Sequence, residues 1–165
     1  MSLGKRIGIV IPSSNVVIEP LVAQHFCKSD DTVHFSRLGV VEIKLDAESL
    51  AQFEMGEQLS AAQKLCDARV DAIVWGGTSS SWLGIGHDEE YCRLIEEKIS
   101  VPTTTCVLEM NRKLVSLGAR RIAIITPYTD DIHNQILDNY EKLGFPRPTG
   151  QNLGGTLSND FASIS

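Results

Sequence analysis

Arg6-Ile-Gly-Ile-Val-Ile-Pro12 and Arg121-Ile-Ala-Ile-Ile-Thr-Pro127 are two copies of one pattern, and they begin 115 residues apart. Each is a short β-branched run typical of a buried parallel strand. A polar turn follows each copy, Ser13-Ser14-Asn15 after the first and Tyr128-Thr129-Asp130 after the second, and then a helical pattern begins. Ile-rich strands that end in proline also arise by convergence. Because the match continues into the turn, the sequence favours a duplicated α/β unit.

The remaining elements alternate in the same way. A third buried strand is predicted at 70–75, and a weaker strand at 33–41 nearer a sheet edge. Apolar residues at helical spacing predict helices over 16–26, 47–68, 88–99, 103–117 and 129–143, with Gly56 a weak point in the second. This order predicts an α/β fold with a parallel sheet and helices on both faces, as in a flavodoxin-like half. Ligands of such sheets bind beyond the carboxyl ends of the strands.

The duplication divides the chain unequally. Residues 1–118 make a complete first α/β half, and residues 119–165 make the beginning of a second, pseudo-symmetric half. Only 45 residues follow Arg120, far fewer than the first copy occupies. We therefore expect the second half to be incomplete in this sequence.

Composition excludes several classes of protein. The chain has 165 residues, 42% of them hydrophobic, and a net charge of -6 with no basic cluster longer than Arg120-Arg121, so nucleic acid is not an expected partner. Its longest apolar run, residues 7–11, is far shorter than the roughly 20 residues that span a bilayer. Since no signal peptide is recognisable, we expect a cytoplasmic protein. Cys27, Cys66, Cys92 and Cys106 form no C-x-x-C pair, which argues against zinc and predicts buried thiols.

Two segments carry polar groups at predicted strand ends. The turn Pro12-Ser13-Ser14-Asn15 offers hydroxyls, an amide and backbone N–H groups at a helix start, which suits an anion, although serine and asparagine there are equally common as helix caps. The run from Trp75 to Gly84 is more specific, because Gly76 and Gly77 allow close approach of the backbone to a ligand.

Thr78 and Ser79 then supply donors facing the crevice expected to hold Asn15. Tyr128 stands in the second copy where Ser13 stands in the first, and its phenol can donate to a carboxylate across the cleft between the halves. The neighbouring run His87-Asp88-Glu89 is interpreted as a solvated helix cap rather than a metal site, since consecutive residues do not converge on one point.

The motifs around these residues resemble those of the aspartate/glutamate racemase superfamily, in its maleate cis-trans isomerase and arylmalonate decarboxylase branch. They are Ile11-Pro-Ser-Ser-Asn15, Gly77-Thr78-Ser79, Pro102-Thr-Thr-Thr105, Leu117-Gly-Ala-Arg-Arg121 and Thr126-Pro-Tyr-Thr-Asp-Asp131. The resemblance runs over essentially the whole chain in order. It implies two pseudo-symmetric halves with an active site between them that needs no metal or coenzyme.

The resemblance also implies residue roles. Thr78, Ser79 and Tyr128 become the catalytic donors that hold a carboxylate and an enediolate, while Pro12, Ser13, Ser14, Asn15 and Gly77 bind substrate. Asn159 loosely matches a second substrate-binding asparagine. Gly77 occupies the place of the first cysteine of the two-cysteine relatives, and a second cysteine is expected near position 192, beyond Ser165.

The expected function is thus that of a cofactor-independent isomerase or lyase acting on a small carboxylate or dicarboxylate through an enediolate-type intermediate. The alternative is a flavodoxin-like module whose 13–15 turn holds a flavin or other phosphate, with Ser81-Trp82 stacking on a flavin ring. The sequence leaves the substrate open, and also whether the protein is a homo-oligomer.

Overall fold

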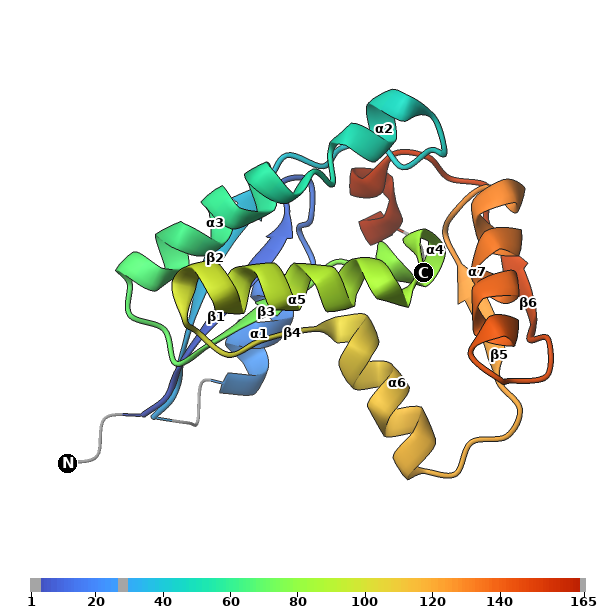
Figure 1. Cartoon of the computed structure of the whole chain (residues 1–165). Helices are drawn as coiled ribbons and strands as arrows, with labels where there is room; N and C mark the ends of the chain where they lie inside the picture. Colours follow the sequence, from blue (N-terminus) through green and yellow to red (C-terminus); the bar gives the residue numbers. More distant parts are fainter. Residues whose placement is uncertain (1–3, 27–29, 164–165) are drawn as a thin grey trace.

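The computed structural model describes residues 4–26 and 30–163 and confirms the α/β fold (Figure 1). Its main sheet is parallel, with strand order β2-β1-β3-β4. The strands are β1 (Arg6–Pro12), β2 (Thr32–Leu38), β3 (Ala72–Trp75) and β4 (Thr103–Thr105). The strand β1 is central, and its residues Val10 and Ile11, which point to opposite faces of the sheet, are both completely buried.

Helices cover both faces of this sheet. In Figure 1, α3 (Met55–Asp67) and α5 (Ile85–Ile99) cross in front of the strands, and α1 (Ile18–Phe26) lies behind them. Leu65 of α3, Ile95 of α5 and Ile73 of β3 belong to one continuous hydrophobic core. Within the described residues, no helix has the length and apolar character needed to cross a membrane. Cys27 lies outside those residues.

Two predicted helices have different boundaries from those expected. The helix predicted over 47–68 is in fact two helices, α2 (Ala47–Ala51) and α3, and the break falls at residues 52–54 rather than at Gly56. Asp46 caps α2 by accepting from Ser49 N, and Phe53 between the helices is turned into the core with 5% exposure. The free energy gained by burying the Phe53 side chain therefore outweighs the helix propensity of residues 52–54, which would favour one continuous helix.

The helix predicted over 103–117 begins as a strand. Three consecutive β-branched threonines form β4, and α6 (Cys106–Ser116) starts only after them. Thr105 ends the strand and also caps α6, because its hydroxyl accepts from Leu108 N at 3.1 Å. A short helix that was not predicted, α4 (Ser80–Leu83), follows β3.

The second copy of the pattern forms a separate unit of β5 (Ala123–Thr126), α7 (Asp130–Lys142) and β6 (Thr149–Asn152). The strands β5 and β6 pair in parallel, as β1 and β2 do, so the two copies begin with the same β-α-β arrangement. The strand β6 was not predicted, because its sequence Thr-Gly-Gln-Asn has no apolar run. The last described element is a 3-10 helix, η1 (Ser158–Ser163).

The second unit packs against the first. Asn139 of α7 donates to the backbone carbonyls of Ser81 and Trp82 at 3.1 and 3.0 Å. The segment before η1 returns to the loop after β2, where Ile43 N donates to Thr156 O at 2.9 Å. These contacts hold the ends of β1, β3 and β5 around one space.

Candidate active site

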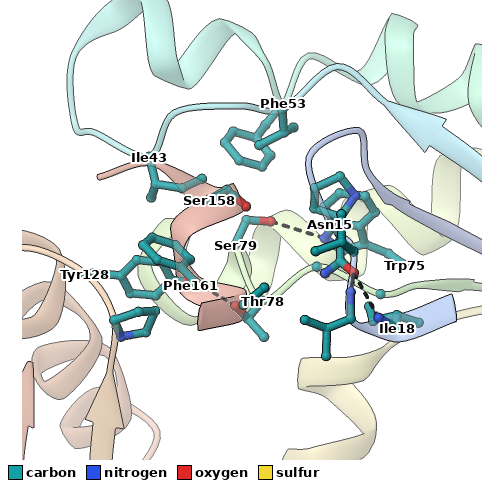
Figure 2. A pocket seen from close by; sticks show the side chains of 18 of the residues that line it. Asn15, Ile18, Ile43, Phe53, Trp75, Thr78, Ser79, Tyr128, Ser158 and Phe161 are labelled. Atoms are coloured by element: carbon teal, nitrogen blue, oxygen red, sulfur yellow. Dashed lines mark hydrogen bonds between the residues drawn. The ribbon is translucent and has the colours of Figure 1, made fainter. Parts of the chain in front are cut away.

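That space is a cavity of about 330 Å³ beyond the carboxyl ends of β1 and β3. Figure 2 shows Tyr128 and Asn15 on opposite sides of it, with Thr78 and Ser79 between them. None of the described residues that line it carries a charge. The lining residues are Pro12, Asn15, Val16, Val17, Ile18, Val40, Ile43, Phe53, Trp75, Gly76, Gly77, Thr78, Ser79, Trp82, Pro127, Tyr128, Ser158, Phe161 and Ala162.

Ser79 is oriented by the last residue of β3. The indole N–H of Trp75 donates to Ser79 Oγ at 3.2 Å. Since an indole can only donate, Ser79 must accept in this bond, and its own O–H stays available for a ligand. Both side chains are buried, with 2% and 5% exposure, so the hydroxyl is held in a rigid and largely dry position.

Thr78 and Tyr128 form a second donor group that joins the two units. The Thr78 hydroxyl and the Tyr128 phenol lie 2.8 Å apart, and one of them donates to the other. Two hydroxyls sharing one hydrogen bond leave one O–H free for a ligand. Burial raises the pKa of Tyr128, an effect that the bond with Thr78 only partly opposes, so the phenol is neutral and able to donate.

Asn15 has one end fixed and one end free. Its Oδ1 accepts from the backbone N–H groups of Val17 and Ile18, each at 3.0 Å, as a cap for the start of α1. This assignment leaves the Nδ2 group unused beside the cavity. The sequence left capping and ligand binding as equal alternatives for Asn15, and the geometry accommodates both.

Not every candidate residue of the first turn reaches the cavity. Pro12 lines it, but Ser13 and Ser14 do not. Both serine hydroxyls donate to Val40 O, at 3.3 and 2.7 Å, which holds the turn against the segment after β2. Their contribution is to place Asn15. Asn159 is exposed and also lies outside the lining, where Ser158 takes part instead.

Gly77 lies where a side chain would not fit. A Cβ atom built there would lie 2.2 Å from Cζ2 of Trp75, much closer than real contacts. Among the described residues, the backbone N–H groups of Gly77, Thr78 and Ser79 have no hydrogen-bond acceptor. Three unpaired N–H groups in a loop that lines a cavity suit an oxyanion.

Cys106 contacts this loop, with its thiol donating to Gly77 O at 2.9 Å. Burial raises the pKa of the Cys106 thiol to about 12, and the nearby charge of Asp88 acts in the same direction. The group is therefore a thiol at neutral pH, unsuited to act as a nucleophile. Cys66 and Cys92 are also free, and neither lines the cavity.

Sequence reasoning missed the apolar wall of the cavity. Ile43 and Phe53 come from the loop and helix break after β2, and Phe161 comes from η1, where it packs edge-on against Tyr128. None of these residues stands in a recognisable motif. Phe53 was counted only as one apolar position of the helix predicted over 47–68.

One sequence interpretation is not favoured and another is wrong. Trp82 was the side chain that the flavin-binding alternative needed for stacking. It is only 3% exposed and packs edge-on against Phe53, with ring centroids 5.3 Å apart. Asp88 was assigned to a solvated helix cap, but it is completely buried within α5.

Comparison with known proteins places this geometry in a family. The family model of arylmalonate decarboxylases matches residues 7–154. A maleate isomerase of Pseudomonas putida is 26% identical over 152 residues, which are 85% of this chain and 60% of that protein. A maleate isomerase of Geobacillus stearothermophilus is 28% identical over 146 residues, covering 81% of this chain and 57% of that protein. The chain thus spans less than two thirds of these relatives.

Solved structures agree on the fold. The maleate isomerase of Pseudomonas putida S16 with bound maleate superposes with a TM-score of 0.83 at 22% identity, covering 98% of this chain and 68% of that one. Unliganded arylmalonate decarboxylase gives a TM-score of 0.75 at 20% identity, covering 98% and 66%. The family model and the two curated maleate isomerases confirm the branch that the sequence motifs indicated. With nine-tenths of its length matched by the family model, the chain belongs to the arylmalonate decarboxylase family.

Proposed function

We propose that this chain forms the donor-bearing part of a cofactor-independent isomerase or decarboxylase that acts on a small carboxylate or dicarboxylate. One observation carries the proposal: the free hydroxyls of Ser79 and of the Thr78–Tyr128 pair, together with the Asn15 amide, border one uncharged cavity. Relatives support it, since one solved maleate isomerase contains maleate and another, from Nocardia farcinica, contains a covalent succinylcysteine intermediate.

The donors are suited to an enediolate. In decarboxylation, the bond to the departing carboxylate breaks and its electron pair moves into the remaining carboxyl group. In isomerisation, a thiolate adds to the double bond, and the same group accepts the electron pair. Either way two oxygens gain charge, which fixed donors stabilise in a dry cavity without reorganising. Thr78, Ser79 and Tyr128 have this catalytic role, and Pro12, Asn15 and Gly77 shape the substrate site, with Ser13 and Ser14 positioning Asn15.

The division of the chain belongs to the same proposal. Residues 1–118 form the first half and residues 119–165 the start of the second, and the protonating or attacking thiol comes from a position near 192. Gly77 then leaves the other face of the substrate without a thiol. We further propose that the protein is cytoplasmic and that it assembles as a homo-oligomer.

Titration with malonate and maleate, followed by amide chemical shifts, tests the site in this chain. We expect shifts at Asn15, Thr78, Ser79 and Tyr128. Ser79→Ala and Tyr128→Phe should each weaken binding about ten- to hundredfold, the worth of a hydrogen bond to a charged group. In a protein that includes the second thiol, each should slow turnover about 10²–10³-fold.

Ser163→Ala is a matched control, since its hydroxyl donates to Asp160 O in η1 and does not line the cavity. Shifts confined to other surfaces, with these residues unaffected, would show that the anion site is elsewhere.

A further inference from the structure

A buried carboxylate lies next to the Gly77–Ser79 loop, which carries the Thr78 and Ser79 hydroxyls and is called the donor loop below. The proposed chemistry does not use this carboxylate. Asp88 of α5 is completely buried, and its Oδ1 atom has no hydrogen-bond partner among the described residues. His87 Nδ1 lies 4.0 Å from Oδ1 and is itself without a hydrogen bond in the described part of the chain. Removing a carboxylate oxygen from water without giving it a hydrogen bond costs stability, so the burial of Asp88 Oδ1 needs an explanation.

The other oxygen of Asp88 joins two segments that frame the loop. Its Oδ2 accepts from Ser80 Oγ at 2.6 Å and also from Thr105 Oγ1. Ser80 directly follows Ser79, and it is completely buried. Thr105 lies beside Trp75 in the pairing of β3 with β4. Asp88 Oδ2 therefore joins Ser80, the residue that follows the loop, to Thr105 of β4. The strand β4 lies beside Trp75 at the other end of the loop.

The next residue along α6 strengthens this arrangement. The thiol of Cys106 donates to Gly77 O, so the start of α6 holds the loop at its first residue while Asp88 holds it at its end. Thr78 and Ser79 lie between the two attachments. Their hydroxyls have no other anchor in β4, α5 or α6, because their bonds go to Tyr128 and Trp75.

We propose that Asp88 is a positioning residue that fixes the Gly77–Ser79 loop so that the hydroxyls of Thr78 and Ser79 meet the substrate carboxylate. This inference rests on the proposed function of that loop. If the inference is correct, the negative charge of Asp88 lowers the stability of the fold and at the same time improves substrate binding. Removing the charge without changing shape should relieve the cost of burial and loosen the loop at the same time.

The matched comparison is Glu96 on the same helix. Its Oε1 accepts from the backbone N–H of Thr103 at 2.8 Å, so it also attaches α5 to β4, but at the end of the strand away from the cavity. Glu96 is exposed. Asp88→Asn and Glu96→Gln therefore remove one charge each from comparable attachments, and only the first should affect the donor loop.

The experiment measures three quantities on the full chain: the melting temperature, hydrogen exchange of the Gly77, Thr78 and Ser79 amides, and malonate affinity from amide shifts. For Asp88→Asn we expect an unchanged or higher melting temperature, loop exchange faster by about tenfold, and malonate affinity weaker by about ten- to hundredfold, since small misplacements of aligned groups have effects of this size. Glu96→Gln should leave the loop exchange and the affinity unchanged.

Thr105→Ser retains the hydroxyl that Asp88 accepts and should behave like the unsubstituted chain, whereas Thr105→Val should reproduce the loss of affinity. A fall in melting temperature together with affinity in Asp88→Asn would assign Asp88 a purely structural role and overturn the proposal, as would unchanged affinity. If the unsubstituted chain binds neither malonate nor maleate, the proposed function fails. In that case hydrogen exchange of the loop amides still tests whether Asp88 positions the loop. Faster exchange in Asp88→Asn supports this role, and unchanged exchange overturns it.

Discussion

The two β-α-β units share a sequence pattern but differ in how their strands are buried. Val10 of β1 is completely buried, whereas Ile125, its counterpart in β5, is 76% exposed. The strand β1 pairs on both edges, with β2 and β3, while β5 pairs only with β6 among the described residues. A β-branched run thus predicts a strand correctly in both places, but the burial of that strand depends on neighbours that the run does not contain.

The helices of the two units differ in the opposite sense to the strands. Ile132 and Ile136 of α7 are buried in the hydrophobic core, whereas Leu21 of α1, the helix between β1 and β2, is 48% exposed. Beside the exposed side of β5 runs an apolar groove of about 490 Å³, lined in part by Met110, Leu114 and Ile125. The second unit is therefore stabilised through its helix, and its strand contributes little.

The largest expected difference follows directly. Ile11→Ala deletes a completely buried side chain from β1 and should lower the free energy of unfolding by about 3 kcal/mol. The same substitution at Ile125 removes atoms that already face solvent and should change it by less than about 0.5 kcal/mol. Urea unfolding of the two variants measures both values. Equal losses would show that β5 is buried in solution, against the comparison drawn above.

The packing of the first unit should also resist an added side chain at Gly77. A Cβ atom there would meet the indole of Trp75, which must move, so we expect Gly77→Cys to cost about 2 kcal/mol of stability. Gly39→Cys is the control, because nothing lies within 4 Å of its Cβ position. The double variant Gly77→Cys with Trp75→Phe should regain part of the loss, since phenylalanine lacks the indole ring edge that collides. A fully stable Gly77→Cys single variant would show that the loop is less tightly packed than the structure indicates.

Gly77→Cys also tests the mechanism in a protein that includes the second thiol. Gly77 leaves one face of the substrate without an acid, so the unsubstituted enzyme should racemise 2-aryl or 2-alkenyl carboxylates negligibly. The cysteine restores a thiol on that face, and racemisation should appear as deuterium exchange with loss of optical rotation. The variant must first be shown to fold and to bind malonate. Ready racemisation by the unsubstituted enzyme would require a second base and would contradict the one-thiol mechanism.

The sequence contained most of the fold and the polar half of the site. Strands with β-branched runs were found, as were Thr78 and Ser79, because ligands of parallel sheets bind beyond the carboxyl ends of the strands. Tyr128 was found because it follows the corresponding strand of the second copy, although that strand lies in a separate sheet. The strand β6 and the attachment by Asp88 were missed for a common reason. A polar segment becomes a strand, and a carboxylate becomes buried, only through partners distant in sequence: β5 for the first, and Ser80 with Thr105 for the second.

A smaller effect is expected at the joint between the units. Asn139→Ala removes two hydrogen bonds from α7 to the backbone of α4 and should lower stability by about 1 kcal/mol. Limited proteolysis should then cut residues 119–165 sooner than in the unsubstituted chain. Asn134→Ala is the control, because its amide donates to Asp130 O within α7 itself. If both variants are cut at the same rate, the attachment of the second unit does not depend on Asn139.

The smallest effect on stability at neutral pH is expected for two buried tyrosine hydroxyls, one in each unit. Tyr91 of α5 and Tyr140 of α7 are 1% and 3% exposed, and neither hydroxyl has a hydrogen-bond partner among the described residues. Burial raises the pKa of Tyr140 to about 12 and raises that of Tyr91 as well. An unfolded tyrosine ionises near pH 10, so above that pH the unfolded chain loses protons that the folded chain retains.

Stability linked to these phenols is therefore fully present below about pH 10 and is lost as the pH rises toward the folded pKa. Tyr140→Phe should change stability by less than about 0.5 kcal/mol at pH 7, since it deletes only an unpaired hydroxyl. It should reduce the loss of stability between pH 10 and pH 11.5, and Tyr91→Phe should do the same. Thermal unfolding from pH 7 to pH 11.5 measures both slopes. If Tyr91→Phe reduces the alkaline loss and Tyr140→Phe does not, α7 is already open to solvent under those conditions, and the second unit separates before the first unfolds.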